Sequence, residues 1–164
     1  MISKMALVAW GLSASLFASN GLRKLSSDVL GAMADVALAS PLVDGEDGPR
    51  VTMAYEVAIA WLEGANDARA IGDGHASYCW GQINLPHGAH TREGWSGPEL
   101  VSDPHKCASV VVRILRMSME KGPADCPLCL YARGRVSDEA RRLSRTRVGL
   151  AHELLETIPA ISAP

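Results

Sequence analysis

The chain lacks an excess of positive charge. Its 16 lysines and arginines are outnumbered by 18 aspartates and glutamates, which gives a net charge of −2. Proteins dedicated to nucleic acids use a cationic surface to neutralise phosphates, so this balance argues against a nucleic-acid partner. The sequence shows no internal repeat either, which argues against an appended repeat-type module.

A long apolar run is also missing. The most apolar stretch, residues 5–18, is interrupted by one glycine and two serines, so it is too short and too polar to predict a membrane span. With Lys4 before it, the stretch resembles a secretory signal, although no small-x-small cleavage site follows. The alternative is a first core helix that ends at residues 19–21. Residues 1–20 thus allow two interpretations, a signal-like segment or a first helix.

What the sequence does contain suits an ordinary globular domain. The chain has 164 residues, of which 48% are hydrophobic and 21% charged, and this length fits one domain with a single core. Apolar residues recur at spacings of three and four over residues 22–42, which predicts a helix. We expect the domain to cover residues 22–158.

The next predicted helix, residues 53–63, has almost no polar face, so it should run through the middle of the domain. Thr52 is its expected cap and Gly64 its stop. Residues 64–77 should form an irregular loop. Capping patterns then predict three further helices: a short one at Ser96 and Glu99, one from Asp103-Pro104 to Gly122, and a last one from Ser137 to about Thr157. The expected fold is mainly α, with about five helices and at most a small β-hairpin near residues 70–85.

Glu63 ends the apolar helix beside Trp61 and Leu62. Burial and the negative end of the helix dipole both favour the protonated form of such a carboxyl group. A carboxylic acid that is still protonated near neutral pH is what glycosidic bond cleavage needs to protonate the leaving oxygen. The alternative is a glutamate that turns outward to water.

The segment that follows Glu63 carries a family resemblance. In order, it contains Gly72-Asp73-Gly74, Ala76-Ser77-Tyr78 and Gln82-Ile83. This resembles the active-site segment of lytic transglycosylases and goose-type lysozymes, in which a helix ends on the catalytic glutamate before a Gly-Asp loop and a Gly-x-x-Gln run. Weaker similarities are the helix start at Asp103-Pro104 and a turn, residues 130–134, similar to the family's Tyr-Asn-x-Gly. The resemblance covers roughly residues 50–135.

The resemblance implies a lysozyme-like domain that cleaves the β-1,4 bond between N-acetylmuramic acid and N-acetylglucosamine in peptidoglycan. Glu63 would act as acid and then as base. In lytic transglycosylases the 6-hydroxyl of muramic acid attacks the anomeric carbon, giving an anhydro sugar, and we favour this reaction slightly. In goose-type lysozymes an aspartate at the position of Asp73 helps to place a water, giving hydrolysis.

The resemblance also implies a set of sugar-binding residues and a setting. The side chains expected to contact the glycan are Ser77, Tyr78, Gln82, Asn84 and Tyr131. Asn84 stands where the family has a further aspartate, and an amide cannot act as a general base. The implied partner is a peptidoglycan strand, with no cofactor, and we expect a monomer. It would act in the cell envelope, as a periplasmic or secreted protein, or be phage-encoded and act on a host wall.

Several positions depart from the family pattern. The most informative are Gly64 in place of serine, Cys79 in place of glycine, Cys107 where asparagine is common, Gly81 directly before the Gln segment, and Ala132 in place of the asparagine of Tyr-Asn. These departures support an alternative function, a catalytically weak or inactive peptidoglycan-binding protein on the same fold.

The four cysteines allow three disulfide pairings, and free buried thiols are the alternative. A zinc module is a further alternative, because Cys126 and Cys129 have ligand spacing and His87 and His90 form a second pair. A whole helix separates the two pairs, so we expect no metal. Trp80 is expected in the core. The basic residues of the last helix are interpreted as a solvated face; they are Arg141, Arg142, Arg145 and Arg147.

Overall fold

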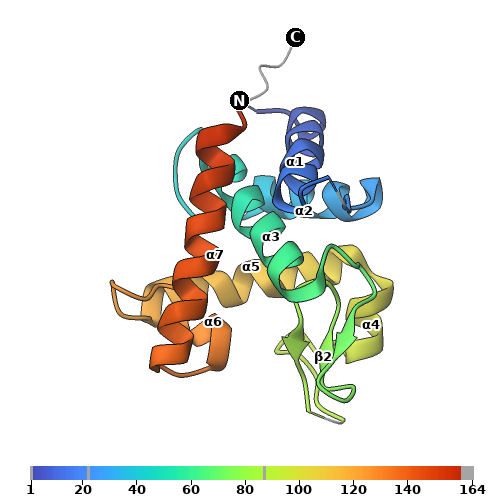
Figure 1. The fold of residues 1–164 in the computed structure, drawn as a ribbon. Coiled ribbons are helices and arrows are strands. Elements are labelled where there is room, and N and C mark those ends of the chain that lie inside the picture. The colour runs from blue at the N-terminus through green and yellow to red at the C-terminus, as the bar shows by residue number, and fades with distance from the viewer. Residues whose placement is uncertain (1, 22, 87, 160–164) are drawn as a thin grey trace.

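The computed structural model describes residues 2–21, 23–86 and 88–159, and within them it has seven helices and a small sheet (Figure 1). The sequence-based prediction of a mainly α fold with a small β element is confirmed. None of the described helices combines the length and the apolar character that crossing a bilayer requires. In chain order the elements are α1 (Lys4–Ala18), α2 (Ser27–Ala39), α3 (Gly48–Gly64), β1 (Ile71–Gly72), β2 (Ser77–Tyr78), β3 (Ile83–Asn84), α4 (Gly97–Ser102), α5 (Pro104–Lys121), α6 (Cys129–Arg133) and α7 (Asp138–Thr157).

Helix α3 runs through the middle of the molecule, as its lack of a polar face predicts (Figure 1). It packs against α1, α2, α5 and α7, and residues 52–60 are all buried. Its predicted start is wrong. The helix begins at Gly48 with Pro49 in its first turn, and Thr52 lies inside it. The Thr52 hydroxyl donates to the Gly48 carbonyl and accepts from the Leu42 amide, so it joins the preceding loop to the helix instead of capping it.

The N-terminal segment forms α1, a helix of the core. Leu7, Trp10 and Ala14 are fully buried, and the Trp10 indole N–H donates to the Ile158 carbonyl at 3.1 Å. Residues 4–18 thus make the contacts expected of a first core helix. Helix α2 begins at Ser27, later than predicted, because the Ser26 hydroxyl caps it by accepting from the Val29 amide. Leu22, the predicted start, lies outside the described residues.

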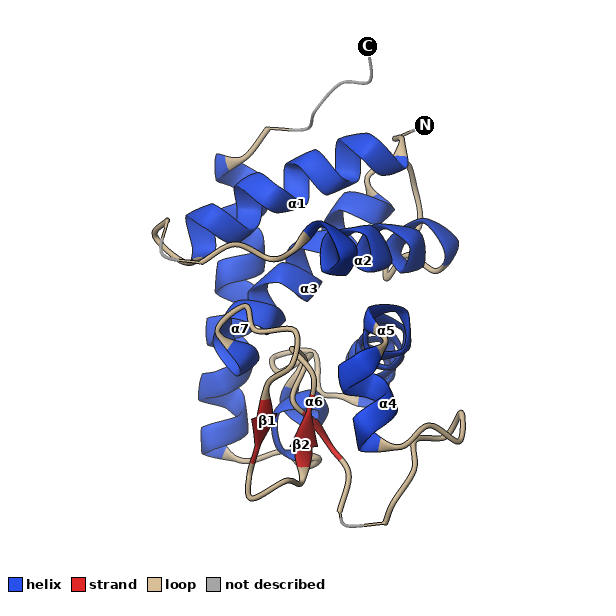
Figure 2. Ribbon diagram, turned by 90° about the vertical axis from the view of Figure 1, so that its right-hand side faces the viewer, coloured by secondary structure: helices blue, strands red, loops and turns tan. Residues whose placement is uncertain are grey.

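The sheet lies below α3, with α7 on one side and α4 and α5 on the other (Figure 2). Its three short strands are antiparallel in the order β1-β2-β3, with Gly72 opposite Ser77 and Tyr78 opposite Ile83. The capping patterns predicted the starts of α4, α5 and α7 correctly, and the predicted ends of α5 and α7 are also confirmed. Helix α6 was not predicted, because its five residues are too few for a periodic signal.

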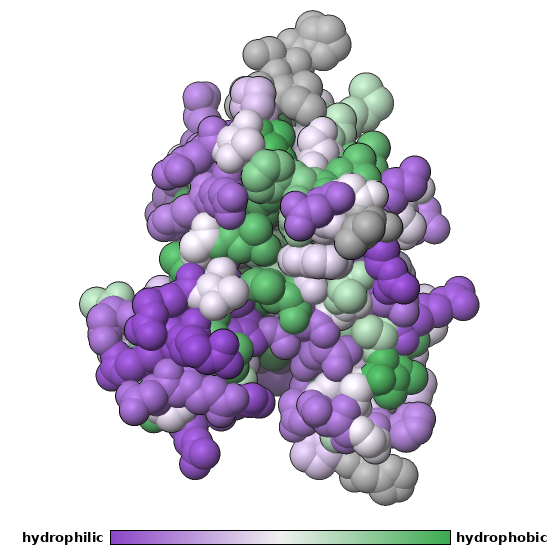
Figure 3. Space-filling view, viewed as in Figure 1, coloured by the Kyte–Doolittle hydropathy of each residue, from purple (hydrophilic) through white to green (hydrophobic). Residues whose placement is uncertain are grey.

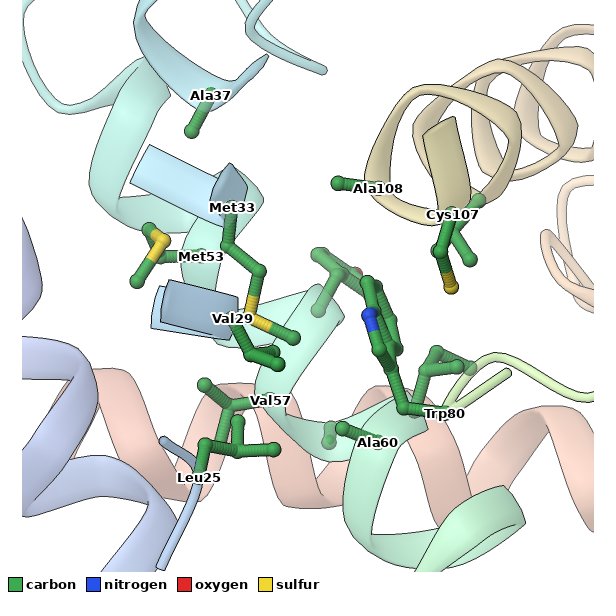
Figure 4. Close-up of a cluster of buried hydrophobic side chains, with 14 of the residues drawn as sticks. Leu25, Val29, Met33, Ala37, Met53, Val57, Ala60, Trp80, Cys107 and Ala108 are labelled. Atoms are coloured by element: carbon green, nitrogen blue, oxygen red, sulfur yellow. The ribbon is translucent and has the colours of Figure 1, made fainter. Parts of the chain in front are cut away.

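Both pairs of cysteines form disulfides, Cys79–Cys107 and Cys126–Cys129. The alternatives of free thiols and of a zinc site built on these cysteines are therefore wrong, because the sulfur atoms are bonded to each other. His87 lies outside the described residues. Trp80 is 1% exposed and packs among side chains of α2, α3 and α5, which confirms its predicted place in the core (Figure 4).

Candidate functional site

A cleft of about 620 Å³ opens below α3, between the sheet and the α6–α7 half of the molecule. Figure 3 shows the surface hollowed there, with mostly hydrophilic residues around the opening. Six of the seven predicted site residues line this cleft: Glu63, Asp73, Ser77, Gln82, Asn84 and Tyr131. The last turn of α3, all three strands or their turns, and α6 therefore converge on one place. Two smaller depressions adjoin the cleft and share Glu63 with it.

Tyr78 is the exception. Its ring lies against Gly97 at the start of α4, so close that an added Cβ there would meet the ring carbons. Its hydroxyl donates to the His75 carbonyl. Tyr78 is not among the residues that line the cleft. Strand alternation explains this placement, because Ser77 and Tyr78 are neighbours and project to opposite faces of the sheet.

Glu63 lies at the end of α3 with 21% of its side chain exposed. Its Oε1 accepts from Arg147 Nε at 2.7 Å and also from Arg147 Nη2. Among the described residues its Oε2 accepts no hydrogen bond, so one carboxyl oxygen is held by the guanidinium and the other is free for a ligand. The sequence-based expectation for Glu63 rested on burial and on the helix dipole, and it did not include this partner.

Arg147 corrects the interpretation of the last helix as a wholly solvated basic face. It is 5% exposed, whereas Arg142 and Arg145 are exposed. A signal for this was in the sequence, since Arg147 falls four residues after Leu143 and four before Ala151, on the stripe that faces the core. An arginine on an apolar stripe needs an acidic partner, and the partner is 84 residues away in the chain.

Asp73 and Ser77 form a second polar pair in the cleft. The Ser77 hydroxyl donates to Asp73 Oδ2 at 2.6 Å. Asp73 is exposed at the turn between β1 and β2 and has a left-handed backbone conformation, with φ of 50°. Ser77 is buried. The hydrogen bond orients the carboxylate of Asp73, which is otherwise exposed. An aspartate that only stabilises a turn does not need such a partner.

Two glycines let the Gln82 segment approach its neighbours closely. A Cβ on Gly72 would lie 2.2 Å from Gln82 Oε1, so the amide of Gln82 rests against β1. Gln82 Nε2 donates to the Cys79 carbonyl at 3.0 Å. A Cβ on Gly81 would lie 2.3 Å from Val111 of α5. Gly81 is therefore required where the family usually has a larger apolar residue.

Tyr131 joins α6 to the same segment. Its hydroxyl donates to the Gly81 carbonyl at 2.7 Å, and its amide donates to the Ser118 hydroxyl of α5. Burial of the hydroxyl and the nearby negative charge of Glu63 raise the pKa of Tyr131 well above its usual value. The phenol therefore stays protonated and holds the Gln82 segment beside the cleft.

Two departures from the pattern of the family that the sequence resembles belong together, because Cys79 and Cys107 form one disulfide. Cys79 has φ of 58°, the left-handed conformation that glycine adopts most easily. Its disulfide with Cys107 joins this strained turn to α5. Gly64 also has a structural reason, because a Cβ there would lie 2.8 Å from the Trp80 carbonyl oxygen. These departures reflect local packing.

Comparisons with protein-family models, curated proteins and solved structures gave no match. The chemistry of the cleft thus rests on its own residues. It combines a partly exposed carboxyl group, a second oriented carboxylate, and amide and hydroxyl groups along one groove. Sugars present many hydroxyl groups to hydrogen-bond, so such a lining suits an oligosaccharide.

Proposed function

We propose that this protein cleaves the β-1,4 glycosidic bond between N-acetylmuramic acid and N-acetylglucosamine in bacterial peptidoglycan, with Glu63 as general acid and then base. The observation that carries the proposal is the convergence of Glu63, Asp73, Gln82 and Tyr131 on one cleft. These four residues lie 9 to 68 positions apart in the sequence, and the fold brings them to one groove.

The two oxygens of Glu63 divide the work in this mechanism. Oε1 stays bound to Arg147, which fixes the orientation of the carboxyl group. Oε2 carries the proton and gives it to the glycosidic oxygen as the bond to the anomeric carbon breaks. The resulting carboxylate then takes a proton from the attacking hydroxyl group. Arg147 is the positioning residue, because it acts through Glu63.

The attacking group decides the product. If it is the 6-hydroxyl of the same muramic acid, no second carboxylate is needed and an anhydro sugar forms, the lytic transglycosylase reaction that we favour slightly. If it is water, Asp73 is the group that helps to place it, oriented by Ser77. Both reactions use Glu63 in the same way.

A specific observation favours a second candidate, a peptidoglycan-binding protein with weak or no catalysis. Glu63 is already engaged in an ion pair with Arg147 that joins α3 to α7, and this is a structural role that requires no catalysis. Ala132 adds to this, because a methyl group lines the cleft where the family has an amide. Such a protein would bind glycan strands through the same groove without releasing products.

The two disulfides support delivery to an oxidising compartment, since such bonds persist outside the cytoplasm. Action in the cell envelope is therefore part of the proposal, whether the protein is periplasmic, secreted or phage-encoded.

The test is mass spectrometry of soluble products after incubation with purified peptidoglycan. Glu63→Gln keeps the size of the side chain and an oxygen for Arg147, so it should fold and lose at least about 100-fold in product release, the scale of general acid catalysis. Glu120→Gln, an exposed change on α5, is the matched control. Anhydro products would identify the lytic reaction and reducing ends the hydrolytic one. Glycan binding without products from the folded wild-type protein would select the second candidate, and full activity of Glu63→Gln would overturn the assignment of the acid.

A further inference from the structure

A smaller, basic pocket continues from the main cleft past Glu63, and no residue of the sheet lines it. Its volume is about 320 Å³, and it lies where the last turn of α3, the end of α6 and the middle of α7 meet. Its lining consists of Leu62, Glu63, Ala132, Arg133, Arg142, Leu143, Thr146 and Arg147. It shares Glu63, Arg133 and Arg147 with the main cleft, but Asp73, Ser77 and Gln82 do not line it and Arg142 lines only this pocket.

The charges of this pocket are unbalanced. Three guanidinium groups line it, against the single carboxylate of Glu63, which Arg147 already holds. Arg133 is paired with Glu139 at 2.6 Å. Arg142 forms no ion pair within the part of the chain that the structure describes. The pocket therefore has a positive charge that no side chain in it neutralises.

Arg147 supplies a second, independent observation. Its Nη1 is buried and has no hydrogen-bond partner among the described residues. A buried charged donor without an acceptor is costly, and such a group in a functional region calls for a ligand. A carboxylate can satisfy two guanidinium donors at once, because its oxygens match their fork-like geometry.

We propose that this pocket binds the carboxylate-bearing peptide attached to the muramic acid residues of the glycan. The inference rests on the proposed function, because it assumes that a glycan strand occupies the neighbouring cleft. Glu63 is shared by cleft and pocket, so a substituent on the sugar beside the reacting bond lies next to the arginines. Leu62, which is 38% exposed, gives the pocket an apolar wall for the peptide's methyl groups. The protein would then prefer peptide-bearing glycan to bare glycan.

The test compares peptide-bearing glycan with glycan from which an amidase has removed the peptides. Wild-type protein should release products faster from the peptide-bearing form. Arg142→Gln should reduce that rate by up to about fivefold, the upper end of the range for an exposed ion pair, and leave the rate on bare glycan unchanged. Arg142→Glu should lose more. Arg145→Gln, an exposed change one turn later on α7, is the matched control and should change neither rate.

A binding measurement distinguishes a failure of the proposed catalysis from a failure of the pocket assignment. Affinities of soluble peptide-bearing and bare tetrasaccharides are measured for wild type and Arg142→Gln by fluorescence anisotropy. If no glycan is cleaved but the peptide strengthens binding only in the wild type, the proposed catalysis fails and the pocket assignment stands. Equal wild-type affinities for the two sugars, or equal losses on both in Arg142→Gln, would overturn the assignment. So would a preference for phosphate-bearing glycan without peptide, which would show that the pocket selects phosphate.

Discussion

Glu56 is the least expected residue of the core. It lies on α3 two turns before Glu63, is completely buried, and neither of its carboxyl oxygens has a hydrogen-bond partner among the described residues. Burial raises the pKa of Glu56 well above its ordinary value of 4.5, so the group is neutral at pH values where an exposed glutamate is charged. The sequence shows Glu56 as a single acidic residue in an apolar helix. It does not show whether the carboxyl group has a hydrogen-bond partner.

The raised pKa of Glu56 predicts a pH-dependent stability. The folded chain holds this proton above pH 4.5 and the unfolded chain releases it, so the contribution of Glu56 is fully present below pH 4.5 and is lost as the pH rises towards the folded pKa. Glu56→Gln stays neutral and should be more stable than wild type above pH 4.5. The difference should grow by at most about 1.4 kcal/mol per pH unit.

Urea unfolding between pH 4 and pH 8 measures this difference. Glu120→Gln is the control, since an exposed carboxyl group should not change the slope. Stability curves of wild type and Glu56→Gln that run parallel over the whole range would contradict the buried, neutral state of Glu56.

Gly64 gives a second prediction, because its replacement should lower the stability of the fold, whereas replacing most helical glycines raises it. Replacing a helical glycine normally stabilises a helix by about 0.5–1 kcal/mol. At Gly64 the added Cβ would lie 2.8 Å from the Trp80 carbonyl oxygen and 3.0 Å from its Cα, and backbone atoms cannot move aside cheaply. Gly64→Ser, the residue usual in the family, should therefore destabilise the fold by about 1–3 kcal/mol.

The control is Gly149→Ala on α7, where nothing lies within 4 Å of the added Cβ. It should show the ordinary gain. Chemical unfolding of both variants compares the two effects directly. A gain in stability for Gly64→Ser would mean that the close approach of α3 and the Trp80 turn is not a constraint.

At the scale of the elements, local signals were reliable where the cause of a boundary is local. The starts of α4, α5 and α7 follow from capping side chains that contact backbone amides two or three residues away. The start of α3 failed for the opposite reason. Thr52 has the chemistry of a cap, but its hydroxyl bonds to Leu42, ten residues earlier. Propensity cannot predict which of two partners a hydroxyl group will choose.

Contacts between distant elements were beyond the sequence. Glu63 lines the cleft, but its bond to Arg147, 84 residues away in the chain, was not predicted. The cysteine count allowed three pairings, and nothing in the spacing distinguished Cys79–Cys107 from the others. The order of the site residues predicted seven side chains, of which six line the cleft and Tyr78 does not. This order did not predict the basic pocket, which forms only when α3, α6 and α7 are packed together.

The Cys79–Cys107 disulfide predicts a difference between the two cysteine pairs. It closes a loop of 28 residues, whereas Cys126 and Cys129 are 3 residues apart. A disulfide that closes a longer loop removes more conformational entropy from the unfolded chain. Replacing Cys79 and Cys107 together by serine should therefore lower the free energy of unfolding by about 3–4 kcal/mol, and replacing Cys126 and Cys129 by about 2 kcal/mol. Urea unfolding of the two double variants tests this. Equal losses would show that loop closure does not dominate.

On the scale of the whole molecule, the cleft lies between the sheet and the α6–α7 half. Helix α7 packs against α3 and α6 against α5, while the sheet packs against α4 and is joined to α5 by the Cys79–Cys107 disulfide. The Tyr131 hydroxyl crosses between these halves to the Gly81 carbonyl, and the bond from Arg147 to Glu63 joins α7 to α3. A glycan in the cleft would contact both halves at once. Helices α1 and α2 lie at the other end of the molecule (Figure 1), so a bound glycan should not contact them.

This arrangement predicts where a bound sugar protects the backbone. Hydrogen exchange of the non-cleaving variant Glu63→Gln is compared with and without a peptide-free tetrasaccharide of alternating N-acetylglucosamine and N-acetylmuramic acid. Exchange should slow over residues 71–84 and 130–134 and stay unchanged in α1 and α2. At ten times the dissociation constant, binding adds about 1.4 kcal/mol of stability, which should raise Tm by about 3–6 °C. Protection confined to one half would mean that the cleft does not hold a strand across Glu63, and protection centred on α1 and α2 would move the binding site to the opposite end of the molecule.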